Sequence, residues 1–329
     1  MTSVTRYPIT LRDIYLARQV TAPYSRRAPL TYAADLSART GTNIYLKLEN
    51  QQETGAFKVR GAANRLLNLT PAERQQGVVT VSTGNHGRGV AHIAQKLGIR
   101  AVICVPELVL PHKVAAMRAL GAEVVIYGRT QDEAEAHALH LQQTEGLTLV
   151  SAFDDPYIIA GQGVIGLEIL EDLPQVDLLV APLSGGGLLG GIALALKRAD
   201  PAIRIVGASQ ALGPAMHLSL QAGHPVAVVE EPSLADSLLG GIGLDNHYTL
   251  PLIREVVDDL VLLSEAEIAA AMIYALRTEK QVVEGGGSVA LGAVLHKKIA
   301  QLEQYRHIVL VISGGNVAID KLVQMTQQC

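Results

Sequence analysis

Short runs of Val, Ile and Leu recur along the chain, separated by segments whose apolar residues follow a helical spacing. Continuous runs of this kind suit strands that are buried on both faces. Strands that alternate with helices form a mostly parallel sheet with helices over its faces. The pattern therefore predicts an α/β protein, with strands at 43–49, 78–81, 101–105, 123–127, 147–150, 176–181, 204–208, 259–263 and 307–313.

Three segments outside this alternation are also predicted to be helical. Before the first strand, helices are expected at 11–16 and 32–40. After it, apolar residues at helical spacing predict a helix over 59–69, which ends near Thr70 and Pro71. A threonine followed by a proline stops one helix and starts the next.

One apolar stretch, 178–196, is uncharged over 19 positions, which is long enough for a membrane-spanning helix. Pro182, Ser184 and five glycines interrupt it. These residues break helices, so the stretch is expected to form a strand, a loop and a helix. We therefore expect no membrane partner.

Composition narrows the class of protein further. The 329 residues are 49% apolar and 18% charged, which is enough to bury a large core. The formal net charge of -4 and the lack of a Lys/Arg-rich block argue against a nucleic-acid partner. Cys104 and Cys329 cannot build a disulfide framework, and the first ten residues carry no secretion signal. A cytoplasmic protein is expected.

Lys58 is the strongest candidate for chemistry. It lies between Phe57 and Val59 at the expected start of a helix. Burial disfavours the charged form of a lysine, and a neutral amine attacks carbonyl groups to form a Schiff base. The plain alternative is a solvated surface lysine.

Three further stretches follow expected strands: 82–87 (STGNHG), 184–188 (SGGGL) and 313–316 (SGGN). In the second, glycines let backbone amides approach an anion, and the following helix start adds a favourable dipole, so a phosphate site is predicted. A flexible turn is the alternative. The stretch 82–87 lies where open parallel sheets place ligand groups. An Asx turn that caps the next helix would also explain its asparagine and glycines.

Together with 53–63 (ETGAFKVRGAA), these stretches resemble the serine/threonine dehydratase family of pyridoxal-phosphate enzymes, of the fold-type-II, tryptophan synthase β-like group. The resemblance covers nearly the whole chain. It implies two domains, each with a twisted, mostly parallel sheet covered by helices: a large domain of residues 1–70 and 150–329, and a small domain of residues 71–149. The stretch 234–246 is similar to the dehydratases of hydroxyectoine utilisation.

The same resemblance implies roles for individual residues. Lys58 would hold the cofactor and act as the catalytic base, Asn85 would meet the ring oxygen, and His86 would orient the substrate carboxylate or pack. The implied cofactor contacts are Phe57, Lys58, Asn85, Ser184, Gly185, Gly186, Gly187, Leu188, Glu284 and Ser313, and the implied substrate contacts are Ser82, Thr83, Gly84, Asn85 and His86. Glu284 would alternatively cap a Gly-rich loop.

Ser313 would hydrogen-bond the pyridine nitrogen. A neutral hydroxyl does not stabilise a protonated ring, so the cofactor would be a weaker electron sink and prompt loss of a β-leaving group would be favoured. The implied activity is α,β-elimination of a β-hydroxy amino acid such as threonine or serine to a 2-oxo acid and ammonia. The chain ends 13 residues after Asn316, which leads us to expect a catabolic enzyme without a regulatory domain.

Some positions depart from the family pattern. Ser184 stands where the family usually has a fourth glycine. Ser209 and Gln210 occupy the place where serine racemases carry an acidic ligand of a divalent cation, which leaves Glu168 and Asp236 as other carboxylates for a cation; we expect no structural metal. A homodimer or homotetramer is expected.

Three alternatives to the elimination remain open at this stage. A β-replacement synthase would share the fold, but such enzymes usually have threonine where this chain has His86. An amino-acid racemase is the second, since Thr83 stands where serine racemase uses a serine. A non-enzymatic nucleotide-binding module is the third, and it would need no buried lysine.

Overall fold

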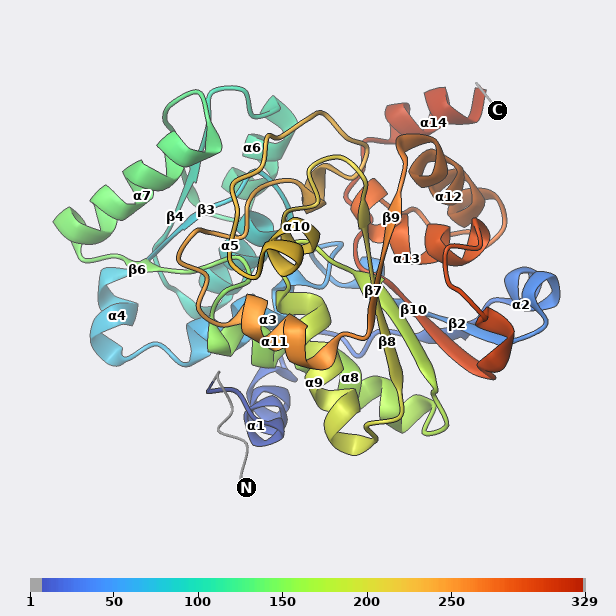
Figure 1. The fold of residues 1–329 in the computed structure, drawn as a ribbon. Coiled ribbons are helices and arrows are strands. Elements are labelled where there is room, and N and C mark those ends of the chain that lie inside the picture. The colour runs from blue at the N-terminus through green and yellow to red at the C-terminus, as the bar shows by residue number, and fades with distance from the viewer. Residues whose placement is uncertain (1–7, 328–329) are drawn as a thin grey trace.

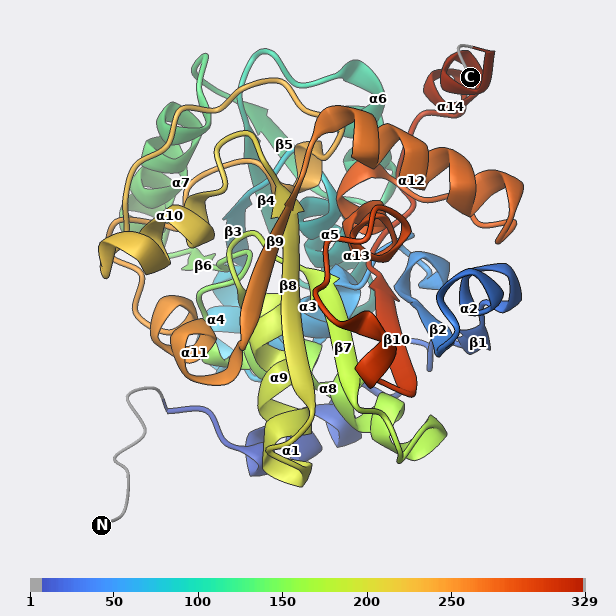
Figure 2. The same ribbon diagram turned by 45° about the vertical axis from the view of Figure 1, so that its right-hand side comes forward.

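The structure, a computed structural model, describes residues 8–327 and contains two sheets. The larger has six strands in the order β1-β2-β10-β7-β8-β9. Its strands are β1 (Leu30–Tyr32), β2 (Asn43–Leu48), β7 (Leu178–Pro182), β8 (Arg204–Gln210), β9 (Asp259–Leu263) and β10 (His307–Ile312). All of its pairings are parallel except that of β1 with β2. Figure 2 shows these strands side by side.

The smaller sheet has four parallel strands in the order β5-β4-β3-β6. These strands are β3 (Val78–Val81), β4 (Ala101–Val105), β5 (Glu123–Ile126) and β6 (Thr148–Leu149). The helices of the described chain are α1 (Leu11–Thr21), α2 (Ala34–Thr40), α3 (Lys58–Leu67), α4 (Pro71–Gln76), α5 (Asn85–Leu97), α6 (Pro111–Ala119), α7 (Gln131–Glu145), α8 (Pro156–Asp172), α9 (Gly187–Ala199), α10 (Ala215–Ala222), α11 (Thr249–Val256), α12 (Glu265–Arg277), α13 (Gly285–Leu295) and α14 (Ile319–Gln327).

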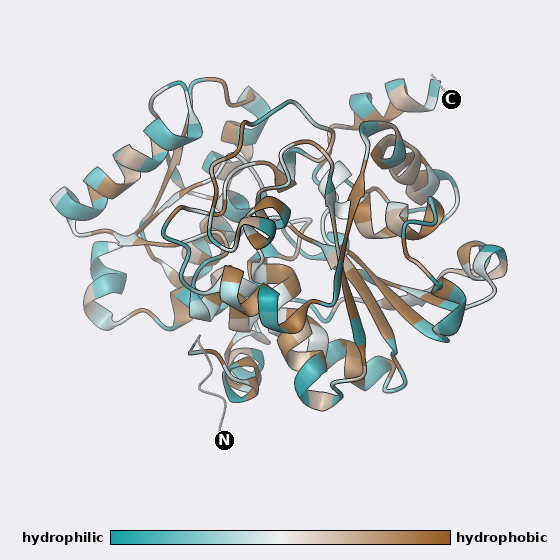
Figure 3. Ribbon diagram, in the orientation of Figure 1, coloured by the Kyte–Doolittle hydropathy of each residue, from teal (hydrophilic) through white to brown (hydrophobic). Residues whose placement is uncertain are grey.

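Helices cover both faces of each sheet (Figure 1). One core of the large sheet packs α1, α8 and α9 against alternate strand residues such as Leu179 and Val309. The other packs α2, α12 and α13 against their neighbours, such as Leu178 and Leu310. The strands of this sheet are hydrophobic along most of their length (Figure 3), as expected of strands that are covered on both sides.

The fold class is therefore confirmed, with some local differences. The expected helix 32–40 begins only at Ala34, and residues 30–32 form the antiparallel edge strand β1 instead. Three residues are too few to show a strand pattern in the sequence. The stretch 178–196 forms β7, a loop and α9, as predicted, and no helix among residues 8–327 has the length and apolarity needed to cross a membrane.

The predicted domain boundaries stay a prediction, although every strand of the small sheet falls within 71–149. Residues 1–7 and Cys329 lie outside the described residues. Cys104 is buried in β4.

Candidate active site

Helix α3 is held between the two sheets. Val59, Ala62 and Leu66 on α3 share one core with Val90 of α5, which covers the small sheet, and with Ile158 of α8, which covers the large one. The backbones of α3 and α8 cross closely, because a side chain at Gly161 would come within 2.7 Å of the Gly61 Cα. The first residue of α3 is therefore fixed at the junction of the two sheets.

Lys58 is that first residue. Its Nζ donates a hydrogen bond of 2.6 Å to the carbonyl oxygen of Ala152 and lies 5.2 Å from the centre of the Phe57 ring. The residue as a whole is half-buried, but its ammonium group lies among protein atoms, and this burial lowers the pKa from 10.5 to about 8. Lys58 therefore loses its proton near neutral pH far more readily than a surface lysine.

The segment before Lys58 is tied to the end of β10. The Phe57 amide donates to the Ser313 carbonyl oxygen over 3.0 Å, and the Gly315 amide donates to the Gly55 carbonyl oxygen over 2.9 Å. Ser313 itself is buried. Two of the stretches predicted from the sequence, 53–63 and 313–316, are thus joined by backbone hydrogen bonds.

The glycine loop 184–188 connects β7 to α9 and lies against Phe153. A side chain at Gly185 would come within 2.3 Å of the Phe153 ring, and Gly186 has φ +89°, which side chains rarely adopt. No side chain caps the first turn of α9. Its amides therefore lack a side-chain acceptor and suit an anion such as phosphate.

This loop gives a direct test of the phosphate prediction. Gly186→Val would place a branched side chain in a left-handed conformation, with its Cβ within 3.1 Å of Met216, Thr249 and Ile253. We expect the affinity for pyridoxal phosphate to fall at least about tenfold, measured by absorbance or fluorescence titration. Gly223→Val is the matched control, because Gly223 also has positive φ but a Cβ at that position would meet no atom within 4 Å. Equal affinities for both variants would show that the loop is only a turn.

Asn85 begins α5 but does not cap it, since no side-chain cap hydrogen bond is present. Its Nδ2 donates to Glu284 Oε1 over 2.5 Å, and its Oδ1 accepts from Asn316 Nδ2 over 2.7 Å. The Asx-turn alternative is therefore wrong. Ser82, Thr83 and Gly84 are half-buried between β3 and this helix.

Glu284 is buried and lies at the start of α13, where its side chain does not cap the helix. Its carboxylate accepts hydrogen bonds from Asn85 and the backbone amide of Asn316. Burial and the negative charge of Asp236 raise its pKa to about 7. The alternative of a capping glutamate is thus wrong, and Glu284 is a titratable group at the junction of the sheets.

His86 is buried next to Lys58. Its Nε2 lies 3.2 Å from the Val150 carbonyl oxygen and donates to it, while Nδ1 has no partner among residues 8–327. Burial and the nearby positive charge of Lys58 lower the pKa of His86 to about 3. The imidazole is therefore neutral at physiological pH and does not act as a cationic acid.

Several of the predicted residues thus lie close together. Ala152 accepts the Lys58 hydrogen bond, and its neighbour Phe153 packs against the glycine loop, so the lysine and the loop are adjacent. A buried amine of lowered pKa, an uncapped helix start lined by glycines and a buried hydroxyl at position 313 match the aldehyde, phosphate and ring nitrogen of pyridoxal phosphate. The residues fit the cofactor, while the individual contacts stay predictions.

The two carboxylates considered for a cation have other partners. Glu168 forms ion pairs with Arg60 and Lys47, and Asp236 forms one with Lys113. Among residues 8–327, no group of three or more His, Cys, Asp or Glu side chains is arranged to hold a metal ion.

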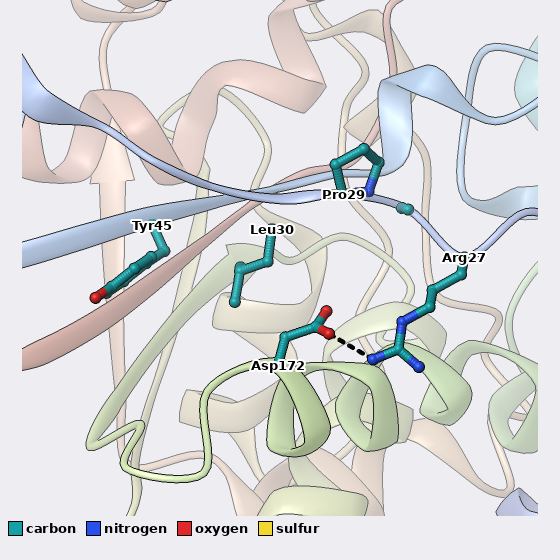
Figure 4. Close-up of a pocket in the computed structure, with 6 residues that line it drawn as sticks. Arg27, Pro29, Leu30, Tyr45 and Asp172 are labelled. Atoms are coloured by element: carbon teal, nitrogen blue, oxygen red, sulfur yellow. Dashed lines mark hydrogen bonds and ion pairs between the residues drawn. The ribbon is translucent and has the colours of Figure 1, made fainter.

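A surface pocket elsewhere does not belong to this site. It lies at the β1 edge of the large sheet and is lined by Arg27, Leu30, Tyr45 and Asp172, with Arg27 paired to Asp172 (Figure 4). Neither Lys58 nor its partners Ala152 and Phe57 line it.

Three contributors to the site have no predicted role. The Ala152 carbonyl is a backbone atom, which leaves no trace in the sequence. Phe153 is one of only two phenylalanines in the chain, and this is the one signal that would have marked it. Asn316 was part of a predicted stretch, but its bonds to Asn85 and to the Thr54 carbonyl depend on tertiary contacts.

Comparisons with known proteins agree with this site. The model of the family described as pyridoxal-phosphate dependent enzyme matches residues 22–314. The chain is 41% identical over 314 residues to the L-threonine ammonia-lyase of Thermotoga maritima, which covers 95% of this chain and 77% of that protein. It is 39% identical over 319 residues to the catabolic L-threonine dehydratase TdcB of Escherichia coli (strain K12), which covers 97% of this chain and 96% of that protein.

Among solved structures, maize serine racemase superposes with a TM-score of 0.91 at 32% identity, over 98% of each chain. The family match spans most of the chain, and the predicted resemblance to the serine/threonine dehydratases is confirmed by the named relatives. The chain therefore belongs to the pyridoxal-phosphate dependent enzyme family.

Proposed function

We propose that this chain is a pyridoxal-phosphate-dependent lyase that converts a β-hydroxy amino acid, such as threonine or serine, to a 2-oxo acid and ammonia by α,β-elimination. The observation that carries the proposal is Lys58, which lies at the junction of the two sheets. Burial lowers the pKa of its amine to about 8. The relatives that are named threonine ammonia-lyase or dehydratase support this substrate class. A catabolic role belongs to the same proposal and is supported by the similarity to the catabolic dehydratase TdcB. A role in hydroxyectoine degradation is also proposed and rests on the stretch 234–246.

When bound, the cofactor supplies an aldehyde for a Schiff base with Lys58 and a ring that withdraws electrons from the substrate α-carbon. The chain's own groups then bind and move protons. Lys58 would also take up the substrate α-proton, because its lowered pKa makes the neutral form available. The first amides of α9, which no side chain caps, would hold the phosphate.

The substrate carboxylate is held by the loop before α5 in this proposal. Ser82 and Thr83 offer hydroxyl groups, and the start of α5 offers amides without a side-chain cap. Asn85 and His86 are both buried beside it. Because His86 is uncharged, the loop binds the carboxylate through neutral donors and the positive helix end.

Racemisation is the second candidate, since maize serine racemase shares the fold at 32% identity and Thr83 keeps a hydroxyl in the loop. The named dehydratases are more similar in sequence and favour elimination. Family membership argues against a non-enzymatic nucleotide-binding module. Nothing in the site favours a β-replacement synthase.

Product analysis tests the proposal. The purified protein with pyridoxal phosphate is incubated with serine, threonine, 3-hydroxyaspartate, phenylserine and a hydroxyectoine-derived amino acid, and ammonia, 2-oxo acid and enantiomer content are measured. We expect equal amounts of ammonia and 2-oxo acid from at least one of them, and none with a Lys58→Ala variant. Inversion of configuration without ammonia would establish the racemase instead.

Assembly into a homodimer or homotetramer and residence in the cytoplasm remain part of the proposal.

A further inference from the structure

A long connection between α10 and α11 lies over the site. We call residues 223–248 the strap; its only helical turn is η2 (Asp236–Leu238). In Figure 1 the strap runs from α10 across the front of the molecule towards α6 before it returns to α11. It contains the stretch 234–246, for which the proposed chemistry has no role.

The turn η2 is packed tightly against the start of α13. A side chain at Gly285 would meet the Leu234 carbonyl oxygen at 2.1 Å, and one at Gly286 would meet Ser237 Oγ at 2.2 Å. The Glu265 carboxylate holds the strap just before the turn, because it accepts from Ser233 Oγ over 2.5 Å and from the Leu234 amide over 2.7 Å. The position of η2 relative to Glu284 is thus fixed on two sides.

Adjacent residues of this turn contact opposite sides of the site. Ser237 Oγ lies against Gly286, two residues after Glu284, because a Cβ on that glycine would be 2.2 Å away. Asp236 Oδ2 lies 2.9 Å from Lys113 Nζ, which is carried by α6 beside the small sheet. The turn η2 therefore brings the Asp236–Lys113 ion pair, which involves α6 beside the small sheet, next to the buried carboxyl of Glu284 at the start of α13.

We propose that Asp236 and Lys113 are positioning residues that set the ionisation of Glu284. The part of this inference that links Glu284 to catalysis rests on the proposed function. Lys113 is 26% exposed and Asp236 51%, so solvent weakens their effect but does not abolish it.

The groups around Glu284 determine the sign of each change. From α5, Asn85 donates to it and the positive charge of Arg88 is attracted to it; from the strap, Asp236 opposes its ionisation and Ser237 favours it; the Asn316 amide also favours it. Asp236→Asn removes a negative charge, so the pKa of Glu284 should fall. Lys113→Met leaves that negative charge uncompensated, so the pKa should rise.

Opposite shifts distinguish the proposal from a structural role, because both substitutions break the same ion pair. The test is a ¹³C NMR titration of side-chain carboxyls in the full chain labelled with ¹³C-glutamate, without and with added pyridoxal phosphate. Glu284→Gln identifies the resonance. We expect shifts of about half a pH unit or more in opposite directions, and smaller shifts at high salt. Lys197→Met and Asp258→Asn, which break a comparable ion pair elsewhere, should leave the titration unchanged.

Shifts in the same direction, or no shift in either variant, would overturn the proposal. In the enzyme loaded with pyridoxal phosphate, kcat/KM for ammonia release is measured as a function of pH. The acid limb of this profile should shift in each variant as the pKa of Glu284 measured by NMR shifts. An acid limb that does not shift would overturn the link to catalysis. Should the chain release no ammonia from any substrate, the proposed function fails, while the NMR titration still decides whether Asp236 and Lys113 control Glu284.

Discussion

Lys58→Ala is expected to abolish Schiff-base formation with pyridoxal phosphate and to reduce ammonia release at least about 10³-fold, since it removes both the nucleophile and the base. The Lys58 side chain contributes one hydrogen bond, to the Ala152 carbonyl oxygen, and burial disfavours its protonated form. The fold should therefore survive, as judged by circular dichroism. Borohydride reduction followed by peptide mapping should place the pyridoxyl group on Lys58 in the unmodified chain.

The pKa of about 8 gives this prediction a pH dependence. The neutral amine is the reactive form. Roughly a tenth of the Lys58 side chains are neutral at pH 7, and about half are neutral at pH 8. Capture of the cofactor should accelerate as pH rises through this range. Lys96→Ala is the control, because Lys96 lies on α5 and pairs with Glu53 near the surface. A pyridoxyl group found on another lysine would contradict the assignment.

The sequence predicted much of this site because its chemistry lies in short stretches that each follow a strand. The carboxyl ends of parallel strands lie at one edge of a sheet, so 184–188 and 313–316, which follow the neighbouring strands β7 and β10 of the large sheet, come together. The stretch 82–87 follows β3 of the small sheet, and the packing of the two sheets brings it to the same junction. The flanks of Lys58 likewise indicated burial. These features are local, so the hydrophobic pattern predicted where the stretches follow strands, whereas the roles of their residues came from the family resemblance and stay predictions.

Contacts between distant segments were not predictable in this way. Asn85 was expected to cap its own helix or to meet the cofactor, but it also bonds to Glu284, 199 residues further along. The strand β1 was missed because its register comes from pairing with β2 and from no pattern of its own. Such partners are chosen by tertiary packing, which overrides local preference.

The ion pairs behind Lys58 are a further example. Arg60 lies in the first turn of α3 and is 1% exposed. Its guanidinium contacts both oxygens of Glu49, at 2.8 and 2.9 Å, and both oxygens of Glu168, at 2.7 and 2.9 Å. Lys47, which is fully buried, lies 2.7 Å from the same Glu168. The cluster joins β2, α3 and α8, and no sequence spacing indicates it.

Arg60→Met should therefore destabilise the protein strongly. It leaves two buried carboxylates with Lys47 as the one remaining cation of the cluster, and removing one partner of a buried ion pair costs about 3–5 kcal/mol. Arg100→Met is the matched control: Arg100 also joins two carboxylates, Glu123 and Glu145, but is 44% exposed, so about 1 kcal/mol or less is expected. Urea unfolding followed by circular dichroism measures both.

Arg60→Lys should recover only part of the loss, because one ammonium cannot bond both carboxylates in the bidentate geometry of a guanidinium. The cofactor affinity of the Arg60→Met variant should fall as well, since Arg60 fixes the turn of α3 that presents Lys58. Equal losses of stability for Arg60→Met and Arg100→Met would mean that the buried cluster adds no more than a surface ion pair. The rigidity of the Lys58 position would then have to come from the packing of α3 between α5 and α8 alone.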